Sequence, residues 1–309
     1  MPPVIFVRHL RKVYGTTIAV DDVSFDVSEG EIFGMVGPNG AGKTTTIECL
    51  EGLRQPDGGE VRVLDLDPIH QEHSLRLLIG TQLQQAHLPD RLKVGEALDL
   101  FASFYPNPDS WLILLERLGL LEKKDDYISK LSGGQRQRMF IALALINKPR
   151  LVFFDELTTG LDPQARLVIW DLLREIRQEG RTVFLTTHLM EEAEKLCDRV
   201  AIIDHGRVIA LDPPAALIRN LGAEHRVLFN VDSRFDPQLL KSISNVTRLE
   251  QDGSQIVVYG RATQPGQPPL VTELVNFLSS QGIAFTDLRM EQPTLEDVFL
   301  QLTGRAIRD

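Results

Sequence analysis

A glycine-rich loop followed by a lysine and threonines is the clearest sign of chemistry in this sequence. GPNGAGKT at residues 37–44 fits the pattern G-x-x-x-x-G-K-[ST] and lies between the apolar run EIFGMV and the helix-like TTTIECLEGL. Glycines let backbone N–H groups surround a phosphate, Lys43 can reach β- and γ-phosphates, and Thr44 can ligate Mg²⁺. A simple tight turn has no use for the Lys-Thr pair. The predicted nucleotide-binding residues of this loop are Gly37, Pro38, Asn39, Gly40, Ala41, Gly42, Lys43, Thr44 and Thr45.

Two adjacent carboxylates end the apolar run LVFFDE at residues 151–156. Strand alternation sends their side chains in different directions. Asp155 can therefore serve a metal ion while Glu156 acts as general base toward an attacking water. Acidic pairs at strand ends also act as helix caps or salt-bridge residues, so this assignment depends on the upstream phosphate loop.

A histidine and a tyrosine are further candidates. His188 ends the apolar run TVFLTTH, and ligands gather at the carboxyl ends of parallel strands. The alternative for a lone histidine is a purely structural role. Tyr14, in KVYG, could stack on an adenine ring, although an isolated tyrosine can equally be a half-buried strand residue.

A second glycine turn occurs in KLSGGQRQRMF at residues 130–140. Ser132 is predicted to cap a helix that begins at Gly133 or Gly134. The absence of side chains on the glycines lets backbone N–H groups approach an anion, as in the first loop. The chain therefore has two predicted anion-binding turns.

The elements that position these residues follow an α/β pattern. Short apolar and β-branched stretches fill the first thirty residues, and helical periodicity dominates residues 88–148. Buried-strand patterns then return at 151–156, 182–188 and 199–212, with helices predicted at 163–179 and 189–197 between them. This alternation predicts a mostly parallel sheet with an inserted helical subdomain.

The composition changes after residue 220, which predicts a first domain over 1–220 and a small α+β domain over 221–309. Strand-like HRVLFNV, VTRLEQ, SQIVVYG and AFTDLRM accompany the helical LVTELVNFLSSQG. GRATQPGQPP at 260–269 is expected to be an exposed loop. The ending PTLEDVFLQLTGR predicts an amphipathic helix with Thr294 as N-cap and Leu295, Val298, Phe299 and Leu302 on one face.

The overall composition is that of a soluble globular protein: of 309 residues, 43% are hydrophobic and 25% charged. No apolar run approaches the roughly 18–20 residues needed to cross a bilayer. The start MPPVIFVRHLRK lacks the features of a signal peptide, and Cys49 and Cys197 have no metal-site spacing, so we expect a cytosolic chain with buried thiols. A net charge of −10 without a basic tract weighs against a nucleic-acid partner.

With LSGGQ at 131–135, the chain resembles the nucleotide-binding subunits of ABC transporters over about residues 4–215. The matching segments, in chain order, are Tyr14 as the aromatic platform for adenine, GPNGAGKTT (37–45) as the phosphate loop, IGTQLQ (79–84) as the glutamine loop, LSGGQ as the signature, LVFFDE as the acidic strand, TGLD (159–162) as the D-loop and TTH (186–188) as the histidine switch. The resemblance implies a P-loop NTPase fold with an antiparallel β subdomain, a helical subdomain and ATPase activity.

The resemblance also implies roles for single residues. Lys43, Glu156, His188 and Gln84 would act in ATP hydrolysis, and the Mg²⁺ ligands would be Thr44, Gln84 and Asp155. The spacing to the following LKVGEAL favours Gln84 over Gln82 and Gln85, and the segment QAHLPDRL would lie where a membrane subunit docks. This chain has Leu157 where the family usually has proline, which removes no reacting group.

In the family, two copies close head to tail around ATP. Ser132, Gly133, Gly134 and Gln135 of one copy would complete the ATP site on the phosphate loop of the other, and Asp162 would help to join the two sites. The resemblance therefore implies a homodimer.

The ending PTLEDVFLQLTGR resembles that of ATPases serving drug, antibiotic and polysaccharide exporters, including the daunorubicin-resistance type. It implies an ATP-hydrolysing subunit at the cytoplasmic face of a membrane, working with a separate transmembrane permease. Two alternatives remain at this point: an importer subunit with the same ATPase chemistry, and a soluble ABC ATPase acting on ribosomes or DNA. The sequence does not encode the cargo.

Overall fold

The computed structural model describes residues 2–82, 88–220, 225–231, 235–260 and 268–304. The described residues form two compact units, one up to Pro214 and the other from Ala215 onward. The sequence-based boundary at residue 220 lies at the end of helix α8 (Pro214–Asn220), whereas the units divide at the beginning of this helix.

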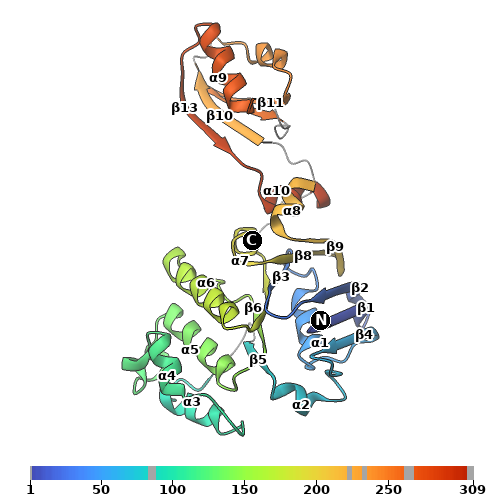
Figure 1. Cartoon of the computed structure of the whole chain (residues 1–309), viewed down its shortest axis with the longest axis vertical. Coiled ribbons are helices and arrows are strands. Elements are labelled where there is room, and N and C mark those ends of the chain that lie inside the picture. Colours follow the sequence, from blue (N-terminus) through green and yellow to red (C-terminus); the bar gives the residue numbers. More distant parts are fainter. Residues whose placement is uncertain (1, 83–87, 221–224, 232–234, 261–267, 305–309) are drawn as a thin grey trace. The chain divides into compact units, whose positions relative to one another are not determined.

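The first unit is built on a nine-stranded mixed sheet (Figure 1), in the order β4-β1-β2-β9-β8-β3-β7-β6-β5. Strands β8, β3, β7, β6 and β5 run parallel to one another, whereas β1 pairs antiparallel with both β2 and β4. The strands are β1 (Ile5–Tyr14), β2 (Thr17–Val27), β3 (Ile32–Val36), β4 (Gly58–Val63), β5 (Ile79–Gln82), β6 (Leu151–Asp155), β7 (Thr182–Thr187), β8 (Arg199–Asp204) and β9 (Arg207–Asp212). The predicted parallel core with an antiparallel β subdomain is confirmed.

The run predicted as one buried strand at 199–212 is two strands. β8 and β9 form an antiparallel hairpin in which Val200 faces Asp212. Between them, His205 and Gly206 have φ angles of 48° and 72°. Positive φ at both central residues is the geometry of the tight hairpin turns that match strand twist, so the chain reverses there.

The predicted helices of this unit are all present, together with one short helix that the periodicity did not indicate, Glu72–Arg76. Around the sheet are α1 (Lys43–Leu50), α2 (Glu72–Arg76), α6 (Pro163–Gln178) and α7 (Met190–Leu196). The predicted helical region contains α3 (Val94–Ala102), α4 (Trp111–Arg117), the short 3₁₀ turns η1 (Leu121–Lys123) and η2 (Ile128–Lys130), and α5 (Gly133–Leu145). In Figure 1, α3, α4 and α5 are grouped together at one end of the sheet.

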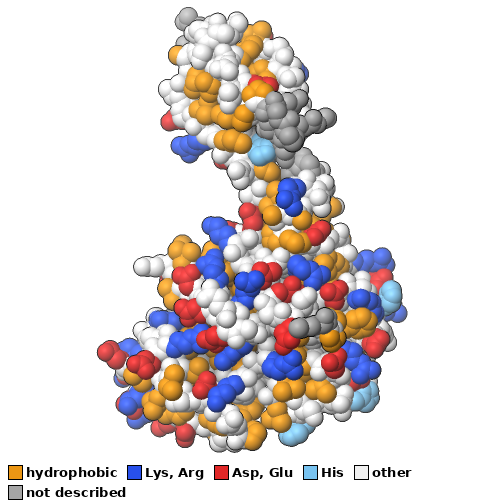
Figure 2. Space-filling model, viewed as in Figure 1, with side chains coloured by type: hydrophobic (Ala, Val, Ile, Leu, Met, Phe, Trp, Pro, Cys, Tyr) orange, Lys and Arg blue, Asp and Glu red, His pale blue; other side chains and the backbone are white. Residues whose placement is uncertain are grey.

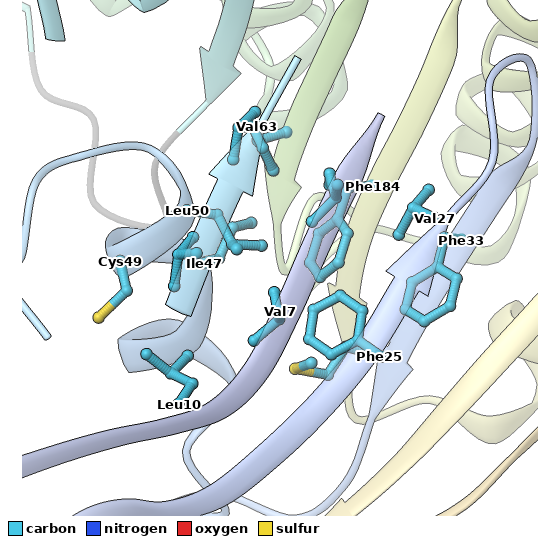
Figure 3. Close-up of a cluster of buried hydrophobic side chains, with 14 of the residues drawn as sticks. Val7, Leu10, Phe25, Val27, Phe33, Ile47, Cys49, Leu50, Val63 and Phe184 are labelled. Carbon is cyan, nitrogen blue, oxygen red and sulfur yellow. The ribbon is translucent and has the colours of Figure 1, made fainter. Parts of the chain in front are cut away.

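An aromatic stack fixes the strands that carry the phosphate loop (Figure 3). The ring of Phe33 on β3 lies 5.3 Å from that of Phe25 on β2 and 5.5 Å from that of Phe184 on β7, and the rings of Phe25 and Phe184 are 6.0 Å apart, between centroids. Ile47 and Leu50 of α1 belong to the same buried cluster. Burial of large aromatic and aliphatic side chains is the main favourable contribution here, so the end of β3 and the beginning of α1 are rigidly placed.

The second unit is an antiparallel sheet in the order β11-β12-β10-β13, covered by α9 (Leu270–Ser280). Its strands are β10 (His225–Val231), β11 (Val246–Asp252), β12 (Gln255–Gly260) and β13 (Phe285–Glu291), with a 3₁₀ helix η3 (Pro237–Ser242) before β11. The predicted α+β class is therefore correct. Most of the loop predicted at 260–269 lies outside the described residues.

The last helix, α10 (Leu295–Thr303), begins after the predicted N-cap. The Thr294 hydroxyl accepts a hydrogen bond from the Asp297 N–H, and the Asp297 carboxylate accepts one from the Thr294 N–H. Of the predicted apolar face, Leu295, Val298 and Phe299 are fully buried, but Leu302 is 39% exposed. The buried face of α10 therefore ends before Leu302, which the periodicity had placed on it.

The surface carries charges of both signs. Figure 2 shows basic and acidic side chains interspersed over the first unit, with apolar side chains scattered among them. In the part of the chain that the structure covers, no helix has the length and apolar character needed to cross a bilayer.

Candidate nucleotide site

The phosphate loop is held in a conformation that needs its glycines. It leaves β3 at Val36 and enters α1 at Lys43, with Gly42 as the N-cap at φ 103°. A Cβ on Gly37 would lie 2.2 Å from the carbonyl oxygen of Ile203, and one on Gly42 would lie 2.5 Å from that of Ala19. Since neither contact is possible, both positions require glycine.

Lys43 curls over this loop. Its Nζ donates hydrogen bonds to the carbonyl oxygens of Gly37 at 2.8 Å and Pro38 at 3.1 Å. Burial lowers the pKa of the ammonium, although the carboxylates of Glu156 and Asp155 oppose this effect. The shortest contacts of this largely buried cation are to neutral carbonyls, so an anion bound in the loop would be attracted to its charge.

Lys43, Glu156 and His188 converge although they come from α1 and the ends of β6 and β7. Lys43 Nζ lies 3.6 Å from Glu156 Oε1, and His188 Nδ1 lies 3.5 Å from the same oxygen. The side chains of Lys43, Glu156 and His188 are only 4%, 6% and 16% exposed. The His188 contact is within attractive range but longer than a good hydrogen bond, which leaves the imidazole able to pair with another group.

The backbone at Glu156 adopts an unusual conformation. Its φ is 51°, in the left-handed region that non-glycine residues rarely occupy. Its N–H donates to both the carbonyl and the hydroxyl oxygen of Thr186, at 3.1 Å and 3.2 Å. Such outliers persist where surrounding contacts fix them, and they are frequent at active sites.

Asp155 points toward the hydroxyl groups of Thr186 and Thr44. Its Oδ1 accepts hydrogen bonds from the Thr186 hydroxyl and, at 3.5 Å, from the Thr44 hydroxyl. Desolvation raises its pKa, opposed mainly by these hydroxyl donors. A carboxylate beside a threonine hydroxyl is the hard-oxygen donor set that suits Mg²⁺, which binds few protein ligands and keeps waters and phosphate oxygens. These two residues therefore fit the predicted ion.

The second glycine turn is a capped helix start, as predicted. The Ser132 hydroxyl accepts from the Gln135 N–H at 3.3 Å, and the Gln135 side chain accepts from the Ser132 N–H at 3.0 Å. Helix α5 begins at Gly133. This capping box leaves the glycines as the open surface of the turn.

The second turn lines a cavity of about 400 Å³ together with Gly160 and Asp162. Asp162 caps α6 by accepting a hydrogen bond from the Ala165 N–H at 2.9 Å. Among the described residues, no member of the phosphate loop lines this cavity. The two predicted anion-binding turns therefore belong to separate sites within one chain.

Tyr14, another predicted site residue, is not part of this cluster. Tyr14 ends β1 and is 40% exposed, with Lys12 Nζ 5.4 Å from its ring centroid. Gln84 and Gln85 lie outside the described residues, while Gln82 is buried at the end of β5. An exposed aromatic face suits stacking on a planar base.

Sequence reasoning missed Glu192 of α7, which is 2% exposed. Its Oε1 accepts hydrogen bonds from Thr158 Oγ1 at 2.8 Å and Trp170 Nε1 at 3.0 Å. It thereby links the turn after Glu156, helix α6 and the helix after His188. In the sequence, only its position one helical turn after His188 points to a role for Glu192. Its burial depends on packing, which the sequence does not show.

Comparison with known proteins identifies the family. A family model described as ABC transporter matches residues 20–159. A Nod factor export ATP-binding protein I from Ralstonia nicotianae is 39% identical, covering 99% of this chain and 96% of the relative. The chain belongs to the ABC transporter family. A protein of the same name from Mesorhizobium japonicum is 40% identical to this ABC ATPase over 96% of its length and 86% of the relative.

Solved structures agree with the ABC cassette fold. An ATP-binding subunit of an ABC transporter has a TM-score of 0.65 and 28% identity, covering 71% of this chain and 93% of that chain. A dimeric bacterial ABC transporter cassette has a TM-score of 0.61 and 30% identity, covering 68% and 98%. A dimeric cassette solved in a post-hydrolysis state with ADP and Pi has a TM-score of 0.62, 27% identity and the same coverage. The predicted fold class, family and ATPase activity are confirmed.

Proposed function

We propose that this ABC ATPase energises an exporter through a separate transmembrane subunit, as a head-to-tail homodimer at the cytoplasmic face of the membrane. The observation that carries the catalytic part is the convergence of Lys43, Glu156 and His188 at the ends of a parallel sheet. Export is favoured over import because both relatives named above are export proteins. The membrane subunit would determine the cargo.

In this proposal, the residues around the phosphate loop divide the chemistry of ATP hydrolysis. The loop N–H groups and Lys43 bind the phosphates, and Glu156 takes a proton from the attacking water. His188 holds the γ-phosphate in line with that water. Thr44 and Asp155 would hold Mg²⁺, with Gln84 as a further ligand, and the ion would offset negative charge on the phosphates. Tyr14 would stack on the adenine ring.

The two separate anion-binding turns support the dimer. A chain that keeps Ser132 and Gly134 in a cavity distinct from its own phosphate loop needs a second copy to bring the two together. ATP contacts both copies only in the closed dimer, so its binding shifts the population toward closure. The C-terminal domain, predicted over 221–309, would brace or regulate this dimer.

Changing Glu156 to Gln tests the catalytic assignment. The amide keeps the size of the side chain but cannot accept the proton, so ATP hydrolysis should fall by at least about a hundredfold. ATP-induced dimerisation, measured by light scattering, should persist. Near-normal hydrolysis in this variant would show that another group is the base.

The partner is tested by co-expression with membrane proteins of the same genome that contain several apolar spans. The ATPase should co-purify with one of them and drive ATP-dependent movement of solute out of the cytoplasmic side in proteoliposomes. Transport in the opposite direction would favour the importer alternative, and binding to ribosomes or DNA instead would favour the soluble one.

A further inference from the structure

Glu192 joins the two chain segments that carry the proposed catalytic side chains. It lies in the first turn of α7, which begins two residues after His188, and its Oε1 accepts a hydrogen bond from Thr158 Oγ1 at 2.8 Å. Thr158 follows Glu156 by two residues. Glu192 is 2% exposed and Thr158 is 1% exposed. Because water does not compete for a hydrogen bond in such a buried place, this bond connects the two segments firmly.

The turn that follows Glu156 has a conformation that needs support. The backbone of Glu156, at φ 51°, lies in the left-handed region, which is unfavourable for a residue other than glycine. The Thr159 N–H donates to the Glu156 carbonyl oxygen at 3.2 Å and closes a tight turn. Thr158 belongs to this turn, and its hydroxyl group attaches the turn to Glu192 on α7. The attachment therefore restrains the backbone that carries the Glu156 side chain.

The acceptor end of this hydrogen bond is fixed to the segment that carries His188. The Leu189 N–H donates to Thr187 Oγ1 at 3.0 Å, so the chain is held on both sides of His188. The Glu192 carboxyl group also accepts a hydrogen bond from Trp170 Nε1 of α6, at 3.0 Å from the same oxygen. The position of the acceptor oxygen is therefore set by α6 and α7, independently of the turn that it holds.

The proposed chemistry depends on where the Glu156 carboxylate lies. Its Oε1 is 3.6 Å from Lys43 Nζ and 3.5 Å from His188 Nδ1. A general base must be within hydrogen-bond reach of the proton that it takes, and a misplacement of about 1 Å can slow a reaction about a hundredfold. A hydrogen bond only two residues away from the base is close enough to control its position.

We propose that Glu192 is a positioning residue for ATP hydrolysis, which acts through Thr158 to hold Glu156 where it can take a proton from the attacking water. This inference rests on the proposed function, since it assumes that Glu156 is the general base. The hydrogen bond joins the turn after β6 to α7 and includes no residue of the phosphate loop. Its loss should therefore slow the catalytic step and leave ATP binding unchanged.

Thr158→Val removes the hydroxyl group and keeps the β-branched shape of the side chain. In steady-state ATP hydrolysis by the full chain, kcat should fall about tenfold, as expected for one lost hydrogen bond, while KM changes less than about twofold. Thr158→Ser keeps the hydroxyl group and should keep kcat within about twofold. An unchanged kcat in Thr158→Val, or an equal loss in Thr158→Ser, would overturn the proposal.

Thr182→Val is the matched control for a general loss of stability. Thr182 is fully buried at the start of β7, and its hydroxyl oxygen accepts a hydrogen bond from the Gly30 N–H at 2.9 Å. The same chemical change there should lower the midpoint of denaturation but leave kcat within about twofold of the wild type. If Thr182→Val and Thr158→Val lose kcat equally, the loss follows stability and the positioning role is wrong.

Two variants of Glu192 test the acceptor. The amide oxygen of glutamine can accept the hydrogen bond from Thr158, so Glu192→Gln should retain most of the wild-type kcat. Glu192→Ala has no acceptor and should lose at least as much kcat as Thr158→Val. Equal losses in Glu192→Gln and Glu192→Ala would contradict a role through this hydrogen bond.

Combination with Glu156→Gln tests whether the effect passes through the base. If it does, Thr158→Val should lower the residual hydrolysis of Glu156→Gln by less than about twofold. A further fall of about tenfold would show that Thr158 acts on another group, which contradicts the proposal. Near-normal hydrolysis in Glu156→Gln alone would refute the proposed base itself. Lost hydrolysis in Glu156→Gln with an unchanged kcat in Thr158→Val would refute only the positioning role, so the two failures can be distinguished.

Discussion

The buried acid at Glu51 should make the stability of the first unit depend on pH in a specific direction. Burial raises the pKa of Glu51 from 4.5 to about 8. Below pH 4.5 the group is protonated whether the chain is folded or unfolded, so it has no differential effect. Between pH 4.5 and 8 the unfolded chain releases this proton while the folded chain retains it, so the folded state loses stability as pH rises.

The expected magnitude follows from the size of the shift. Each pH unit in this window lowers the free energy of unfolding by about 1.4 kcal/mol. At pH 7 the accumulated loss is on the order of 3 kcal/mol, a large part of the roughly 5–15 kcal/mol typical of a folded protein. Glu51→Gln cannot ionise and therefore lacks this slope. Its own buried amide adds an unfavourable contribution that is independent of pH.

The assay is chemical denaturation at pH 5, 6, 7 and 8, followed by tryptophan fluorescence. Trp111 and Trp170 both lie in the first unit, as does Glu51, so the signal reports the relevant unfolding. The difference in unfolding free energy, Glu51→Gln minus wild type, should increase steadily with pH. Glu116→Gln, at an exposed position, is the control and should follow the wild type. A difference that stays constant from pH 5 to pH 8, or that decreases, would refute the reasoning.

Three further outcomes are expected. Glu192→Ala leaves two buried donors unpaired and should lower the free energy of unfolding by about 3 kcal/mol, while Glu192→Gln, which keeps an acceptor oxygen, should lose less in denaturation experiments. Gly42→Ala should abolish ATP binding in calorimetry because its Cβ would lie 2.5 Å from a backbone carbonyl oxygen, whereas Gly40→Ala, whose Cβ meets nothing within 4 Å and is disfavoured only by the φ of 78°, should weaken it much less. Mixing a Lys43→Ala chain with a Ser132→Arg chain should restore ATP occlusion, because the mixed dimer has one site with both turns intact; no recovery would contradict the composite site.

The sequence by itself determined the features that depend on neighbouring residues. The glycine pattern at 37–44 predicts a turn that only glycine can form, and the structure shows the backbone carbonyls that exclude a Cβ at Gly37 and Gly42. Likewise, Ser132 and Gln135 predict a capping box because their spacing of three places each side chain at the other's N–H. Hydrophobic periodicity and helix capping depend on residues close together in the chain, so helix α5 begins where the sequence predicts.

Only the tertiary structure decided which distant residues meet and which acids are buried. The hairpin of β8 and β9 depends on the turn at His205 and Gly206, which the apolar run at 199–212 concealed. The convergence of Glu156 and His188 on Lys43 depends on the order of β3, β7 and β6 in the sheet. Glu192 and Glu51 are ordinary glutamates in the sequence, yet one is held by two donors and the other by none among the described residues. Contacts between segments far apart in the chain decide which glutamates are buried, so the local sequence pattern does not predict it.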